Sequence, residues 1–164
     1  MGYVGIHKKG EFSLSELLQS IKGKEDFLRT GAIAIFVGVV RGKTVGSKNV
    51  EGLELEAYEE EANNVLGVIC ENLKKREGVV DVQIHHFVGK FSVGEDLVYV
   101  VVAGGHRQNI FRVLEEAVER YKRETPVFKK EHIVDVTGAK EAYWVSEREL
   151  QKIPKKKIIR HPSN

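Results

Sequence analysis

The chain has 164 residues, 41% of them hydrophobic and 30% charged, with a formal net charge of +2 at pH 7. These values fit a globular protein with one hydrophobic core, and they exclude the overall basic charge of many nucleic-acid-binding proteins. The one cysteine, Cys70, cannot form an intrachain disulfide or a cysteine-based metal site. The longest apolar runs, Ala32–Val40 and Leu97–Ala103, are too short to span a bilayer, and no secretory signal is visible, so we predict a cytoplasmic protein.

The first predicted elements are a short helix and two strands. A capping box begins at Ser13, and apolar residues follow it at helical spacing, which predicts an amphipathic helix at 13–22. The Ile-, Val- and Phe-rich segment Gly31–Arg41 predicts a buried strand. A polar, glycine-bearing loop is expected at 42–49, and alternating apolar and acidic residues then predict a half-buried strand at 53–58.

The second part of the chain combines two long helices with further strands. In chain order we predict a helix at 59–77, strands at 80–86 and 97–103, a helix at 108–124, and short strands at 126–135 and 142–145. Gly78 is placed to end the first of these helices, and residues 88–95 are rich in turn formers. Because strands and helices do not alternate strictly, we expect an α+β fold with a largely antiparallel sheet and helices packed on one side. Residues 1–150 would form a single domain and 151–164 a basic C-terminal tail.

Basic side chains occur where predicted strands and helices end. Arg41 closes a strand, and His106 and Arg107 follow another strand and open a helix. Lys122 is expected on the last turn of that helix, and Lys129 follows seven residues later. Helix-start N–H groups and arginine bind anions, so convergence of these residues would form a site for a phosphorylated ligand. A lysine crowded by other cations loses its proton more readily and can then act as an acid, a base or a nucleophile.

The same residues also allow other interpretations. Most exposed arginines and lysines are simply solvated, and His85 and His86 are more typical of strand residues than of metal ligands. No carboxylate or cysteine stands at a recurring ligand spacing, so we predict no metal and no resident cofactor. A non-catalytic module that binds anions or nucleic acid stays open as an alternative, although an aromatic content of 8% with no evident stacking platform argues against it.

Several short segments in a fixed order resemble one known family, the large, catalytic subunits of molybdopterin synthases. These segments are Gly31-Ala32, Phe36–Arg41, Leu55–Tyr58, Val88–Glu95, Gly105–Arg107, Lys122 and Pro126–Glu131. The resemblance implies an α/β hammerhead fold and a homodimer that binds a small ubiquitin-like sulfur-carrier subunit at each end, giving a heterotetramer. The C-terminal Gly-Gly thiocarboxylate of that small subunit would supply the sulfur. The substrate would be cyclic pyranopterin monophosphate, and the product the dithiolene of molybdopterin.

The resemblance also assigns roles to individual residues. Lys122 would lie beside the terminal carbonyl of the small subunit for acid–base or transient covalent chemistry, and Lys129 would orient the substrate and assist proton transfer. The substrate-binding residues would be Val39, Val40, Arg41, His106, Arg107, Lys122, Lys129, Lys130 and Glu131. The chain departs from the family pattern at four positions, Glu61, Phe87, Ile110 and Phe128. A scaffold that binds a ubiquitin-like protein without catalysis is the remaining alternative.

Overall fold

The computed structural model describes residues 4–44 and 46–146, so the basic segment expected at 151–164 lies outside the described residues. In chain order the elements are β1 (Gly5–Lys8), α1 (Leu14–Lys22), the 3-10 helix η1 (Glu25–Arg29), β2 (Ala32–Val39), β3 (Asn49–Ala57), α2 (Glu59–Lys74), β4 (Val79–Ser92), β5 (Asp96–Gly104), α3 (Arg107–Glu124), β6 (Val127–Val134) and β7 (Lys140–Ser146).

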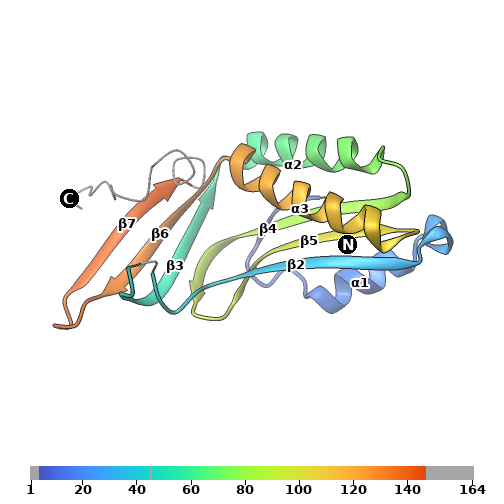
Figure 1. Ribbon diagram of the computed structural model, residues 1–164. Helices are drawn as coiled ribbons and strands as arrows, with labels where there is room; N and C mark the ends of the chain where they lie inside the picture. The colour runs from blue at the N-terminus through green and yellow to red at the C-terminus, as the bar shows by residue number, and fades with distance from the viewer. Residues whose placement is uncertain (1–3, 45, 147–164) are drawn as a thin grey trace.

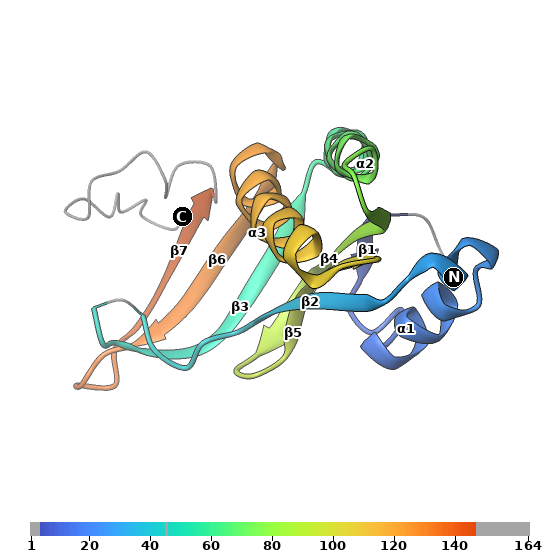
Figure 2. The same cartoon turned by 45° about the vertical axis from the view of Figure 1, so that its right-hand side comes forward.

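The strands of the described residues form one seven-stranded sheet in the order β2-β5-β4-β3-β6-β7, with β1 paired to β4 beside this path. The β1–β4 pairing is parallel and the other pairings are antiparallel. Helices α2 and α3 lie together on one face of the sheet, and the short α1 lies on the opposite side (Figures 1 and 2). The prediction of an α+β fold with a largely antiparallel sheet and its long helices on one side is confirmed.

The long strand β4 joins two parts of the sheet. Its first part pairs with β5, from Val79 to His86, and its last residues, Gly89–Ser92, pair with β3. Gly89 has φ +132°, a backbone conformation that residues with a Cβ rarely adopt, and it lies where β4 passes from one part to the other. The second part, β3-β6-β7, projects from the first like the head of a hammer (Figure 1). The prediction of a turn-rich segment at 88–95 was therefore wrong up to residue 92, because the glycine bends a continuous strand.

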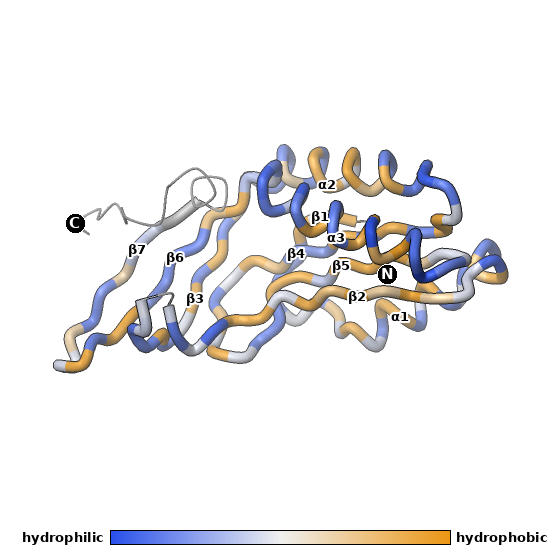
Figure 3. Tube along the Cα trace, viewed as in Figure 1, coloured by the Kyte–Doolittle hydropathy of each residue, from blue (hydrophilic) through white to orange (hydrophobic). Residues whose placement is uncertain are grey.

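The central strands bury both of their faces. On the face below α3, the His86 ring lies 5.9 Å from the Tyr121 ring of that helix. On the other face, Tyr99 and His85 pack around Phe12, which lies between β1 and α1. Figure 3 shows the result as nearly continuous hydrophobic colour along β2 and β5, whereas hydrophobic and hydrophilic residues alternate along β3 and β6. A strand covered on both sides has no polar face, which explains why its sequence reads as a continuous apolar run.

Several element boundaries differ from the predicted ones. Ser13 caps α1 with the predicted capping box. Helix α2, however, ends at Lys74 rather than at residue 77, because Leu73 is its last buried residue and the polar residues beyond it have no apolar surface to cover. Gly78, at φ +76°, instead turns the chain into β4. Strand β3 begins at Asn49, earlier than predicted, and β1 was not predicted because four residues carry too little periodic signal.

Candidate functional site

The direction of three neighbouring elements determines which candidate residues lie close together. Strand β2 runs antiparallel to β5, with Ala32 opposite Gly104 and Val39 opposite Asp96. Helix α3 follows the Gly104 end of β5 and packs back over β5 and β2. The end of α3 that carries Lys122 therefore lies at the Val39 end of β2, which is also where Arg41 leaves the sheet.

Lys122 lies on the last turn of α3, and its Nζ is 5.5 Å from the centre of the Phe36 ring of β2. An ammonium group over an aromatic face is attracted to the ring, so Phe36 holds the Lys122 amine against the sheet. Phe36 carries no signal for this role in the sequence, because an aromatic residue in an apolar strand looks like any other core residue. Val39, further along the same strand, is 47% exposed, whereas Val40 is buried.

Strand β6 brings a second lysine to the same end of the sheet. It begins at Val127, directly after α3 and the Thr125-Pro126 connection, and it carries Lys129 and Glu131 on one face. The Lys129 Nζ lies 3.1 Å from a Glu131 carboxylate oxygen, and the two side chains are 15% and 22% exposed. Lys129 therefore has a balancing negative charge within ion-pair distance.

Lys130 faces the other side of β6 because side chains alternate along a strand. Its Nζ lies 5.4 Å from the centre of the Trp144 ring of β7. Lys130 is therefore separated from Lys129 and Glu131 by the sheet itself, so these three neighbours in sequence do not share one surface.

His106 and Arg107 lie at the opposite end of α3 from Lys122. His106 is the N-cap of α3 and Arg107 its first residue, and both are exposed. At about 1.5 Å per residue, the helix places Arg107 about 22 Å from Lys122 along its axis. A single copy of the chain therefore does not bring the predicted cationic residues together.

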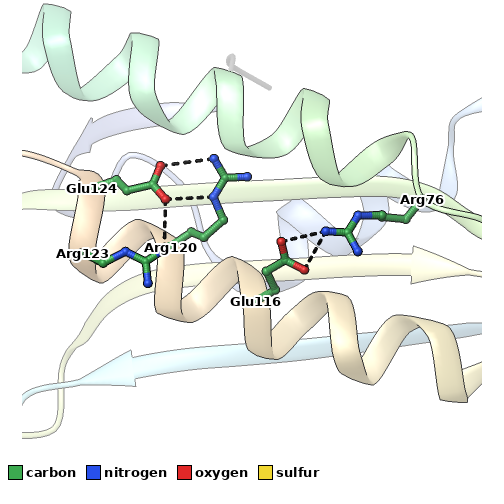
Figure 4. Close-up of polar contacts among 5 residues, drawn as sticks. All are labelled: Arg76, Glu116, Arg120, Arg123 and Glu124. Atoms are coloured by element: carbon green, nitrogen blue, oxygen red, sulfur yellow. Dashed lines mark hydrogen bonds and ion pairs between the residues drawn. The ribbon is translucent and has the colours of Figure 1, made fainter.

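Ion pairs hold the last turns of α3 on the outer surface. The Arg120 guanidinium donates to both carboxylate oxygens of Glu124, at 2.9 and 3.2 Å, and Arg123 donates to the same carboxylate (Figure 4). One turn earlier, Glu116 accepts two hydrogen bonds from Arg76, which follows α2 (Figure 4). The Arg120–Glu124 pair is bidentate and fixes the geometry of both side chains within the last turns of α3, whereas the Arg76–Glu116 pair links α3 to the end of α2.

The remaining candidate residues are buried. The Cys70 thiol packs in the core, and burial raises its pKa to about 12. His85 and His86 are buried in β4, and burial lowers the pKa of each to about 4. Within residues 4–44 and 46–146, no group of three or more His, Cys, Asp or Glu side chains is arranged to hold a metal ion. In the same part of the chain, no helix is both long and apolar enough to cross a membrane.

The model of the MoaE protein family matches residues 7–124. The chain belongs to the MoaE family. The match begins within β1 and includes α1, ahead of Gly31-Ala32, the first segment on which the resemblance rested. A probable molybdopterin synthase of Haloferax volcanii is 39% identical over 137 residues, which cover 83% of this chain and 51% of that relative. The chain thus spans about half the length of this relative. A molybdopterin synthase catalytic subunit of Pyrococcus abyssi is 34% identical over 126 residues, covering 77% of this chain and 82% of that one.

Solved structures agree with this MoaE-family membership. The crystal structure of molybdopterin synthase from Staphylococcus aureus superposes with a TM-score of 0.73 at 29% identity, covering 88% of this chain and 98% of that chain. A complex of subunits 1 and 2 of molybdopterin-converting factor from Helicobacter pylori contains a chain that superposes with a TM-score of 0.64 at 27% identity, covering 77% of this chain and 82% of that chain. The fold is therefore shared with solved molybdopterin synthase structures over most of the chain.

Proposed function

We propose that the protein is the catalytic subunit of a molybdopterin synthase. It would transfer sulfur from the thiocarboxylated C-terminus of a small ubiquitin-like subunit to cyclic pyranopterin monophosphate, forming the dithiolene of molybdopterin in the cytoplasm. The observation that carries this proposal is the placement of Lys122 and Lys129 at one end of the sheet, in a protein whose only cysteine is buried. A site with two amines and no reachable thiol suits chemistry in which a partner supplies the sulfur.

The two lysines would have different tasks. Lys122, held over the Phe36 ring, would lie beside the terminal carbonyl of the small subunit and exchange protons with it as the sulfur leaves. Lys129, whose charge is balanced by Glu131, would orient the substrate and pass protons to it. Val39 and Arg41 lie at the same end of β2 and would complete this half of the substrate site. Residues 1–150 would act as one domain.

A homodimer would supply the missing half of the site. Phe111, Leu114 and Val118 form an apolar stripe along α3 that leads to Lys122, and Phe111 is 59% exposed. Leu114 lies midway between Arg107 and Lys122, so a two-fold axis near Leu114 would pair two α3 helices in opposite directions. In that arrangement the partner's Arg107 would approach Lys122. The partner's His106 and Arg107 would then bind the substrate phosphate.

The small subunit would bind once to each protomer and give a heterotetramer. The Helicobacter pylori structure is a complex of subunits 1 and 2 of molybdopterin-converting factor, which supports an assembly of two kinds of chain. Of the other residues that the family resemblance assigns to substrate binding, Glu131 would act beside Lys129. Val40 and Lys130 would act indirectly, because one is buried and the other faces Trp144.

Reconstitution tests the chemistry directly. The purified chain is mixed with a thiocarboxylated small subunit and cyclic pyranopterin monophosphate, and the dithiolene product is detected by mass. We expect Lys122→Ala and Lys129→Ala each to abolish product while the fold is retained, and the exposed Lys75→Ala to match the wild type. Full turnover by both site variants would reject the proposal.

Mixing two impaired variants, at a substrate concentration at which neither gives product alone, tests the shared site. If each site uses Lys122 of one protomer and the partner's Arg107, a mixed dimer of Lys122→Ala and Arg107→Ala chains has one doubly altered site and one intact site. Random exchange of subunits should then restore about a quarter of the wild-type activity. A mixture that stays inactive after verified subunit exchange would mean that the site lies within one protomer.

A further inference from the structure

Three chain segments meet as bare backbone at the point where β5 passes into α3. Gly31 directly precedes β2, Gly78 directly precedes β4, and Gly104 ends β5. The Gly31 N–H donates to the Gly104 carbonyl at 2.9 Å, and the Gly105 N–H donates to the Gly78 carbonyl at 2.9 Å. The short segment that leads to His106 is therefore held by backbone hydrogen bonds to two other turns of the chain.

Gly31 approaches this segment so closely that a side chain would not fit. A Cβ added at Gly31 would lie 2.5 Å from the Gly105 carbonyl oxygen, whereas ordinary contact begins near 3.4 Å. The two backbones would have to separate by about 0.9 Å to admit it. Gly105 itself has room, because a Cβ there would lie 3.8 Å from its nearest neighbour, the Arg29 carbonyl oxygen. The requirement for glycine thus falls on Gly31, although Gly105 is the residue beside His106.

A side chain adds a second fastening within the first turn of α3. The Asn109 Nδ2 donates to the Glu77 carbonyl at 3.2 Å. A Cβ at the neighbouring Gly78 would lie 2.6 Å from this nitrogen, so the glycine makes room for the amide. Ile110, the next residue of the helix, is fully buried and packs against Gly104. The start of α3 is therefore fixed both by the segment before β2 and by the turn between α2 and β4.

The position of this helix start determines where the charge of Arg107 lies. Arg107 is the first residue of α3 and is exposed, so its side chain extends into solvent from the backbone that carries it. A guanidinium grips a phosphate through two parallel hydrogen bonds, and this geometry tolerates little displacement. A shift of the helix start by the separation that a Cβ at Gly31 requires would misalign these bonds.

We propose that Gly31 and Asn109 are positioning residues for the anion site, because they hold the start of α3 where Arg107 can reach the substrate phosphate in the site of the partner protomer. This inference rests on the proposed sulfur transfer and its shared site. It also gives a role to Gly31-Ala32, a segment of the family pattern that carries no reactive side chain.

Kinetic constants of the reconstituted enzyme test the positioning role. Gly31→Ala should raise KM for cyclic pyranopterin monophosphate about tenfold and leave kcat within about twofold, as expected when one charge-assisted hydrogen bond to a non-reacting group is misaligned. Asn109→Ala should raise KM in the same direction, and it keeps the test open if Gly31→Ala does not fold, because the Asn109 side chain is exposed. An unchanged KM in either folded variant would overturn the positioning role of that residue.

The matched control is Gly67→Ala, which makes the same substitution within α2. A Cβ at Gly67 meets nothing within 4 Å, so this variant should keep the wild-type KM. A second comparison asks whether the effect passes through Arg107. If Asn109 acts by placing that side chain, adding Asn109→Ala to Arg107→Ala should leave KM unchanged, whereas effects that multiply would show an independent structural role and overturn the proposal.

Titration with inorganic phosphate separates a failure of this inference from a failure of the proposed function. Amide NMR of the labelled full chain follows phosphate binding at Arg107 without the small subunit and without turnover. Gly31→Ala should bind phosphate about tenfold more weakly than the wild type, and Gly67→Ala should match the wild type. Equal affinity in Gly31→Ala and the wild type would overturn the positioning role and leave the sulfur transfer untouched. A wild type that forms no product, with phosphate affinity still lost in Gly31→Ala, would reject the sulfur transfer and keep the positioning of Arg107.

Discussion

Acid should destabilise the fold through His86, and the structure allows the size of the effect to be worked out. The ring lies within β4 under α3, is 5% exposed, and bonds through Nδ1 to the Phe87 carbonyl at 3.1 Å. A cation in this position loses its hydration and gains no anion among the partners of the ring in the structure. Burial therefore lowers the pKa of His86 from 6.5 to about 4.

The direction of the pH effect on the free energy of unfolding follows from which state, folded or unfolded, binds the proton. Between pH 6.5 and about 4 the unfolded chain protonates His86 and the folded chain does not. The stability contributed by the neutral ring is complete above pH 6.5 and is lost as the pH falls towards 4. The free energy of unfolding should decrease by up to about 1.4 kcal/mol per pH unit, and by about 3 kcal/mol over the whole window.

Urea unfolding at half-unit steps from pH 7.5 to 4.5 measures this slope. The comparison protein is His86→Gln, which keeps a donor for the Phe87 carbonyl but cannot titrate. The free energy of unfolding of this variant at pH 7.5 will be lower than that of the wild type, because glutamine does not have the shape of the imidazole ring. The difference in free energy of unfolding between the two proteins should shrink steadily below pH 6.5. Parallel pH profiles for the two proteins would show that His86 does not exclude a proton in the folded state.

Three further predictions concern packing, reactivity and surface charge. Gly104→Ala should lower stability by about 1–3 kcal/mol in urea unfolding, because the added Cβ would collide with the Gly78 carbonyl; an unchanged midpoint would contradict this close approach. Cys70, with its pKa raised to about 12 by burial, should resist iodoacetamide at pH 8 in the folded protein and react once unfolded, as mass spectrometry can follow. Arg120→Gln should cost about 1 kcal/mol by loss of the Glu124 pair, and the difference should shrink in high salt if the interaction is ionic.

Local signals in the sequence determined most of the elements. The capping box at Ser13 and the helical spacing of apolar residues in α2 and α3 act over a few residues, so the sequence alone shows them. The order of short segments between residues 31 and 131 was also sufficient to indicate the family. Lys122 and Lys129 could be singled out because the spacing between them is part of this family order of segments.

Only the tertiary structure decided which residues meet. Gly89 looked like part of a turn, yet it bends a strand that pairs on both sides of it. Arg107 and Lys122 were predicted to share one cationic site, yet the length of α3 holds the two apart within one chain, so the proposed site would need a second copy. The hydrogen bond between His7 of β1 and His85 of β4 had no signal in the sequence, because strand register is set by the combined packing of the sheet and not by either histidine. Spacing along the chain determines local structure over a few residues, whereas pairing register and helix direction determine which distant groups come together.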